Sequence, residues 1–132
     1  MKRRRKHGCL AAVAVAAAAY AAAGRGQAPD ARMAEMEQGR QVYEYWCGTC
    51  HGPGLGLPGF GALPGTHQLR LKYRGTDIPA VLDERTDLVP EFIKVMVRQG
   101  VSFMPQFRKT EISDAELDAL AAYLTRNNSD AR

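Results

Sequence analysis

The residues with the clearest chemical meaning are the five in Cys47-Gly48-Thr49-Cys50-His51, where two thiols are followed at once by an imidazole. On one helical turn, the two sulfurs lie on neighbouring positions of the same face. Two thiols at this spacing can add across the two vinyl groups of a haem, and the histidine can ligate its iron. The pentad therefore predicts one covalently attached haem c, with Cys47 and Cys50 as attachment sites and His51 as an iron ligand.

Two other interpretations of the cysteine pair compete with haem. Residues 46–50 also resemble the redox dithiol of thioredoxin-like proteins, but that dithiol follows a buried strand of a βαβ unit. Here the preceding apolar residues recur at helical spacing, and no parallel sheet is indicated downstream. A structural zinc site needs four ligands, and beyond the pentad the chain offers His67 and, near the N-terminus, Cys9. Haem is the favoured interpretation.

Residues 1–23 have the form of an export signal. A basic segment over residues 1–8 precedes an apolar run over 9–23 that is mostly alanine. This run is too short and too weakly apolar to form a stable membrane-spanning helix. Small residues before Gly24 suit a cleavage site, and a retained anchor is the alternative. We expect a periplasmic protein with no membrane span after cleavage, because haem attachment outside the cytoplasm fits export of an unfolded chain.

Cleavage would change the charge of the protein. The leader carries five of the eighteen Lys and Arg residues and none of the fourteen Asp and Glu residues, so the mature chain would have a net charge of −1. The basic isoelectric point of the full sequence is therefore a property of the leader. Nothing in the mature sequence indicates binding to nucleic acid or to an anionic membrane.

A second iron ligand is expected on the loop that follows a helix stop at Gly100. There Met104 precedes Pro105, which stiffens the loop, and a thioether is a soft donor that favours ferrous iron. Met104 is thus the predicted sixth ligand, with ordinary packing as the alternative. His67 could serve instead in a bis-histidine site, although a surface position suits it better. Helical spacing gives the other candidate methionines core positions: Met33, Met36 and Met96.

The elements that must position these ligands are helices. One helix is predicted from about Met33 to Cys50, with Gly39, Val42, Tyr43 and Trp46 facing inward. Because a glycine inside a helix costs stability, Gly39 suggests that another helix crosses its backbone closely. The last helix is the expected partner, with Gly39 and Tyr43 against Tyr123. Its capping box is Ser113 with Glu116, and its apolar face comprises Leu117, Leu120, Ala121, Tyr123 and Leu124.

The middle of the chain is less regular. A further helix is predicted over Pro90–Gln99, ended by Gly100, and its expected core stripe is Phe92, Ile93, Val95 and Met96. Residues 52–65 are rich in glycine and proline and carry Leu55, Leu57, Phe60 and Leu63, so we interpret them as a loop that covers the haem. A carbonyl near Pro58 or Pro64 could accept the His51 Nδ1 proton. A short helix near 65–73 and a loop near 75–79 complete this stretch.

These elements indicate one domain without repeats. We expect a flexible tail over residues 24–32, the folded domain over 33–127 and a short C-terminal tail over 128–132. A domain of about this size has little apolar surface to bury, so a buried macrocycle would matter to its stability.

Four stretches together resemble the class I monohaem cytochromes c: residues 39–43, 47–52, 100–105 and 112–124. The resemblance covers most of the expected mature chain. It lies in the order of the motifs: a glycine and an aromatic residue on the first helix, then the haem motif, the ligand loop and the final helix. More narrowly, residues 72–75, 84–88 and 101–114 resemble cytochrome subunits of flavoproteins that oxidise para-alkylphenols, such as eugenol hydroxylase and p-cresol methylhydroxylase.

The resemblance implies an all-α fold around one low-spin haem and outer-sphere transfer of single electrons. It further implies that the donor is a separate flavoprotein dehydrogenase acting on a para-substituted phenol, with another protein as downstream acceptor. A quinoprotein dehydrogenase or a respiratory chain is the alternative partner. A thioredoxin-like thiol-disulfide oxidoreductase and a gas-binding or peroxidatic haem protein are alternatives of other classes. No nucleophile or acid–base pair is left over, so we do not expect a stand-alone enzyme.

Overall fold

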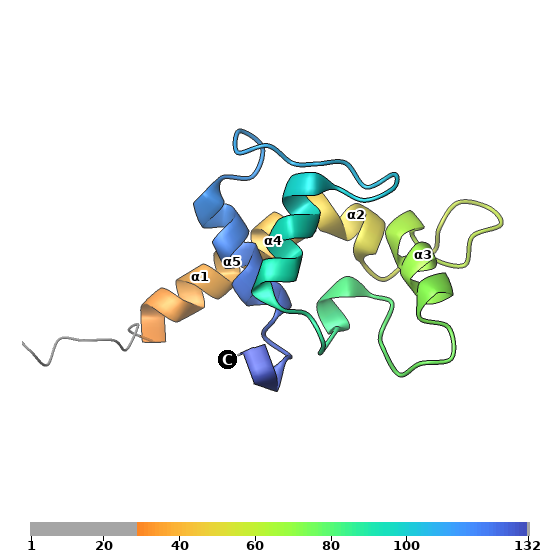
Figure 1. The fold of residues 1–132 in the computed structure, drawn as a ribbon, viewed down its shortest axis with the longest axis horizontal. Coiled ribbons are helices and arrows are strands. Elements are labelled where there is room, and N and C mark those ends of the chain that lie inside the picture. Colours follow the sequence, from red (N-terminus) through yellow and green to blue (C-terminus); the bar gives the residue numbers. More distant parts are fainter. Residues whose placement is uncertain (1–28, 132) are drawn as a thin grey trace, which may run out of the picture.

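Helices make up the regular structure of residues 29–131, the part of the chain described by the computed structural model (Figure 1). The helices are α1 (Pro29–Val42), the π-helix η1 (Tyr43–Cys47), α2 (Gly48–His51), α3 (Pro64–Lys72), α4 (Pro90–Gln99) and α5 (Asp114–Leu124), with short 3-10 turns η2 (Leu82–Glu84) and η3 (Ser129–Ala131). Within residues 29–131 the only β-type pairing is an isolated bridge between Val101 and Met104. The predicted all-α class is confirmed.

The first three helical elements form one continuous stretch from Pro29 to His51. The helix therefore begins four residues before the predicted start at Met33, so residues 29–32 are helical and not part of a tail. Asp30 in the first turn complements the positive end of the helix dipole. The predicted leader and residues 24–28 lie outside the described residues.

α1 and α5 cross at Gly39, as the sequence predicted. A Cβ at Gly39 would lie 2.1 Å from the carbonyl oxygen of Ala119 and 2.7 Å from Cβ of Tyr123. No larger residue fits this crossing without moving one helix backbone. The Tyr43 and Tyr123 rings pack beside it with centroids 5.7 Å apart, which confirms the expected contact.

α5 carries the largest share of the core. Its capping box is formed as predicted, since the Ser113 hydroxyl accepts from the Glu116 N–H and the Glu116 carboxylate accepts from the Ser113 N–H. Leu117, Leu120, Ala121 and Leu124 are buried, while Tyr123 is half-buried. The buried apolar cluster combines α5 with residues from the other helices and from the loops: Val42, Tyr43, Cys47, Leu88, Ile93, Val97, Ile112, Leu117, Leu120, Ala121 and Leu124.

α4 has the predicted bounds, but its core stripe differs from the prediction. Ile93 and Val97 are its buried residues, whereas Phe92 and Val95 are exposed and Met96 is half-buried. Ile93 and Val97 are four residues apart and therefore lie on one face of the helix. The prediction was right for Ile93, but it added Phe92, Val95 and Met96 and omitted Val97. Gly100 ends the helix with φ of 68°, a conformation that favours glycine.

The chain between α3 and α4 is fastened by buried polar groups. α3 confirms the expected short helix, shifted by one residue. Arg85, only 4% exposed, donates through Nε to Asp87 and through Nη2 to the Tyr73 hydroxyl, and its guanidinium stacks 4.5 Å from the Tyr73 ring centroid. Asn128 is also buried and donates to the Leu88 carbonyl. Asn128 thus ties the chain after α5 to the segment that precedes α4.

No helix among residues 29–131 has the length and apolar character needed to cross a membrane.

Candidate functional site

The cysteine pair lies where the first helical stretch changes its winding. η1 spans Tyr43–Cys47, and α2 resumes normal α-helical winding at Gly48. A π-turn widens the helix locally, and such turns are frequent at functional sites. Cys47 is buried and Cys50 is exposed, and both are free thiols. Burial raises the pKa of the Cys47 thiol to about 12, so Cys47 is protonated at neutral pH.

His51 ends α2, and its imidazole is enclosed by the start of α3. Nδ1 is buried and has no hydrogen-bond partner. A Cβ at Gly65 would lie 2.6 Å from Cε1 and 2.7 Å from Nδ1 of this ring, so only glycine leaves room for it. Desolvation lowers the pKa of His51, which favours the neutral imidazole that a metal requires. The expectation that a carbonyl near Pro58 or Pro64 accepts from Nδ1 is wrong for this arrangement, because no acceptor among residues 29–131 lies within hydrogen-bond distance of Nδ1.

Thr66 joins α2 to α3 and had no recognisable signal in the sequence. Its side chain is 1% exposed, and Oγ1 donates to the Gly52 carbonyl at 2.9 Å, with the Cys50 carbonyl at 3.4 Å. A single hydroxyl thus fixes the end of α2 against the helix that encloses His51. The proximity of residues 52 and 66 depends on how the intervening loop folds back, which local sequence patterns do not reveal.

The loop that carries Met104 has a defined tight turn. The N–H of Val101 donates to the Met104 carbonyl at 3.1 Å, and the N–H of Met104 donates to the Val101 carbonyl at 2.9 Å. Ser102 adopts φ of 55° inside this turn. A Cβ at Gly100 would lie 2.6 Å from the Met104 carbonyl oxygen, so Gly100 both ends α4 and admits the turn. Met104 itself is half-buried.

The same loop is fastened to two helices. The Phe107 N–H donates to the Val97 carbonyl at 2.9 Å. Arg98 on α4 donates to the Phe107 carbonyl at 3.0 Å and pairs with Asp114 at the start of α5, also at 3.0 Å. The Phe107 ring packs edge to face on Trp46, with centroids 5.6 Å apart. These contacts hold the Met104 segment in place relative to the helix that bears the cysteines, and Arg98 was not identified from the sequence.

The other methionines occupy different surroundings. Met33, predicted to face the core, is 64% exposed, so that prediction is wrong. It lies in the second turn of α1, ahead of the crossing with α5. Met36 and Met96 are half-buried.

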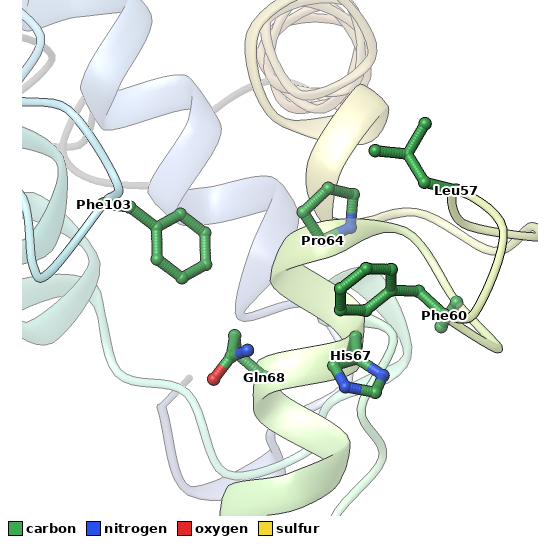
Figure 2. A pocket seen from close by; sticks show the side chains of 7 residues that line it. Leu57, Phe60, Pro64, His67, Gln68 and Phe103 are labelled. Atoms are coloured by element: carbon green, nitrogen blue, oxygen red, sulfur yellow. The ribbon is translucent and has the colours of Figure 1, made fainter.

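An apolar cavity of about 270 Å³ opens between the Met104 loop and α3. Phe103 lies on one side of it and faces Pro64 and Gln68 of α3, while Leu57 and Phe60 lie on the loop that precedes α3 (Figure 2). Ala62 and His67 complete the lining. The loop over residues 52–63 is compact, since the Phe60 N–H donates to the Leu57 carbonyl and Gly56 lies against the Ala62 backbone.

These residues fit a covalently attached haem. Two free thiols and a seated imidazole with a buried, unpartnered Nδ1 lie at the end of one helical stretch, and a cavity lined mostly by apolar residues opens beside the helix that encloses the imidazole. Among the described residues, His, Cys, Asp and Glu side chains do not gather in groups of three that could hold a metal ion by themselves. The structural zinc alternative therefore lacks its ligand set within residues 29–131.

Comparison with known proteins identifies the family. Residues 34–124 match the family model described as cytochrome C oxidase, cbb3-type, subunit III. Neither a curated protein nor a solved structure matches the chain. The matched stretch begins within α1, contains the pentad and the Met104 loop, and ends at the last residue of α5. The chain therefore belongs to the family of cbb3-type oxidase subunit III cytochrome c domains, which are electron-transfer proteins that carry covalent haem c.

Proposed function

We propose that this protein is an exported carrier of single electrons in which Cys47 and Cys50 bind the haem, and His51 and Met104 ligate its iron. The observation that carries the proposal is the His51 imidazole, seated against Gly65 at the end of the helix that bears both thiols. Intact mass should show one haem per mature chain, and an optical redox titration should show one single-electron step. A haem-free, folded protein with a reversible bond between the two cysteines would overturn the proposal.

Each residue has a defined task in such a carrier. When bound, the haem supplies a one-electron iron couple. Thr66 fixes the end of α2 against α3, Gly65 leaves room for the imidazole, and a neutral His51 leaves Nε2 free to ligate. Arg98 holds the loop that carries Met104 through the Phe107 carbonyl. Because His51 and Met104 would both ligate the iron, it would have no site left for a substrate, and the bound haem would serve outer-sphere transfer of electrons.

The thiol-disulfide oxidoreductase alternative finds little support. A redox dithiol needs a nucleophilic thiolate with a lowered pKa, whereas burial raises the pKa of Cys47. The pair follows a helix, and the described residues form no sheet in which a thioredoxin-like βαβ unit could occur.

We further propose that the donor is a flavoprotein dehydrogenase acting on a para-substituted phenol. The support is the sequence resemblance over residues 84–88 and 101–114. Both segments also have structural roles, since Arg85 fastens the chain between α3 and α4 and residues 101–114 brace Met104. Stopped-flow mixing of the oxidised protein with such a dehydrogenase and its phenol should reduce the haem at a rate that saturates with dehydrogenase concentration. Much faster reduction by a quinoprotein would reassign the donor.

A respiratory role is a second candidate, and the family match favours it. The matched model is named for subunit III of a cbb3-type cytochrome c oxidase. In that case the reduced protein should be oxidised rapidly by a membrane fraction that contains such an oxidase, with oxygen as the final acceptor. The two candidates are compatible, because one concerns the donor and the other the acceptor. Fractionation of the exporting host, with haem detected in the periplasmic fraction, tests the proposed location.

A further inference from the structure

Charge is unevenly distributed along this chain. Residues 45–76 contain Arg70, Lys72 and Arg74 and no Asp or Glu. The rest of the chain after the predicted leader contains ten basic and fourteen acidic residues. The stretch that includes the pentad, the cavity loop and α3 is therefore positive, while the remainder of the mature chain is negative.

Arg70 and Lys72 lie in the last turn of α3, and Arg74 lies two residues beyond its end. All three side chains are exposed, and none takes part in an ion pair within the described residues. Arg70 donates to the Gly61 carbonyl at 3.2 Å, and the Lys72 ammonium lies 5.4 Å from the Tyr73 ring centroid. Most other cations are paired with carboxylates: Arg40, Arg85, Lys94, Arg98, Lys109 and Arg126.

A shallow depression of about 500 Å³ lies beside these cations, lined by Gly61, His67, Arg70, Tyr73, Arg74 and Thr76 among others. His67 also lines the apolar cavity next to Phe60, and the two rings are in edge-to-face contact at 5.1 Å. We call His67, Arg70, Lys72 and Arg74 the basic edge. It adjoins the cavity through His67, and three of its four residues lie on the helix whose first turn encloses His51.

We infer that the basic edge is the docking surface for an acidic face of the protein that exchanges electrons with this one. Unpaired cations on an otherwise negative protein attract a negative surface and orient it during encounter, which raises the association rate. The inference rests on the proposed electron-carrier function and adds the charge and place of the contact. A docked partner would lie beside the apolar cavity and the imidazole that we assign to iron.

A protein partner suits this edge better than an anionic membrane. Segments that bind anionic lipid gather about four to eight Lys and Arg residues. The basic edge has three such residues, and two of them, Arg70 and Arg74, line a depression together with an aromatic and a hydroxyl side chain. That shape accepts a small protruding acidic segment of another protein.

The test uses the haem-loaded protein and a reduced acidic flavodoxin as the model protein donor, mixed in stopped flow at low ionic strength. The variant with Arg70→Gln, Lys72→Gln and Arg74→Gln should be reduced about tenfold more slowly than the parent, and the difference should vanish in high salt. Arg32→Gln is the matched control, because the first turn of α1 lies at the opposite end of the molecule from α3 (Figure 1). It should leave the rate unchanged.

Small redox probes separate docking from damage to the haem site. Oxidation of the reduced protein by ferricyanide, a trianion, should slow in the triple variant, while oxidation by cationic cobalt tris(phenanthroline) should not. If the triple variant were oxidised more slowly by both probes to the same extent, the haem site would be disturbed and the inference overturned. Equal rates of reduction by flavodoxin for the triple variant and the parent would also overturn it. Phosphatidylglycerol vesicles should not sediment the protein, and sedimentation abolished in the triple variant would reassign the edge to a membrane. Failure of every protein donor to reduce the parent would instead count against the proposed carrier function.

Discussion

The two ends of this small protein are packed in different ways. Where α1 crosses α5, backbone meets backbone at Gly39, and side chains such as Leu120 are completely buried. Around the apolar cavity near α3, large apolar side chains remain exposed, with Leu55 at 86% and Phe103 at 62%. The first region is closed by the polypeptide alone, whereas the second presents apolar surface without a polypeptide partner.

The comparison shows which part of the fold the haem has to complete. Burial of apolar surface contributes about 25 cal/mol per Å² to the free energy of unfolding. The exposed apolar side chains near the cavity do not make this contribution. A flat apolar macrocycle held by the pentad could cover part of that surface. We therefore expect the α1–α5 crossing to retain helical structure without haem, and the α3 side to depend on it.

Loss of the haem attachment should have the largest effect. Cys47→Ala and Cys50→Ala should each impair attachment, because each thiol makes one of the two thioethers, and His51→Ala should be more severe because the iron also loses a ligand. Intact mass and hydrogen exchange measure the outcome, with protection lost first over residues 52–76. Uniform protection across the chain in a haem-free variant would contradict the division into two regions.

Removal of the proposed sixth ligand should change the iron without unfolding either region. Met104→Ala should abolish the sulfur-to-iron absorption band, lower the reduction potential and let carbon monoxide bind, because a soft donor to ferrous iron is lost. Met96→Ala is the control: it should spare the band and lower the free energy of unfolding by roughly 2 kcal/mol, the low end of the range for a buried truncation, since Met96 is only half-buried. The opposite pattern would move the ligand to Met96.

The same contrast explains what the sequence could predict. The Gly39 crossing, the Ser113 capping box and the Gly100 stop follow from local rules for glycine and helix ends, and all three are confirmed. Thr66 and Arg98 could not be found, because their partners are carbonyls and carboxylates brought close by the tertiary fold. The α4 stripe was misplaced because periodicity shows an apolar face without showing which part of it another element covers.

Substitution of two glycines should distinguish an effect on the stability of the fold from an effect on the haem site. Gly39→Ala gains up to about 1 kcal/mol of helix propensity but places Cβ against the Ala119 backbone, so we expect a net destabilisation of about 2 kcal/mol. Gly65→Ala pushes Cβ against the His51 ring, so the optical spectrum and the potential should change while far-ultraviolet circular dichroism is kept. Gly48→Ala is the control, because its nearest neighbour atom would lie at 3.5 Å. Equal spectra for the Gly65 and Gly48 variants would contradict the assigned seat of His51.

The smallest expected effect concerns the capping box of α5, in the region closed by the polypeptide alone. Ser113→Ala should lower the free energy of unfolding by about 1 kcal/mol without changing the haem spectrum, because the Glu116 N–H loses its acceptor.

The Ser113 hydroxyl and backbone N–H also donate to the Glu116 carboxylate and lower its pKa below the ordinary value of 4.5. A lowered folded-state pKa contributes stability above the unfolded pKa that is lost as the pH falls through the folded value. The difference between parent and variant in urea unfolding should therefore be full at neutral pH and shrink below about pH 4.5. Thr110→Ala removes an exposed neighbouring hydroxyl and should show no such dependence. A difference for Ser113→Ala that stays constant with pH would mean that Glu116 does not interact with the hydroxyl in solution.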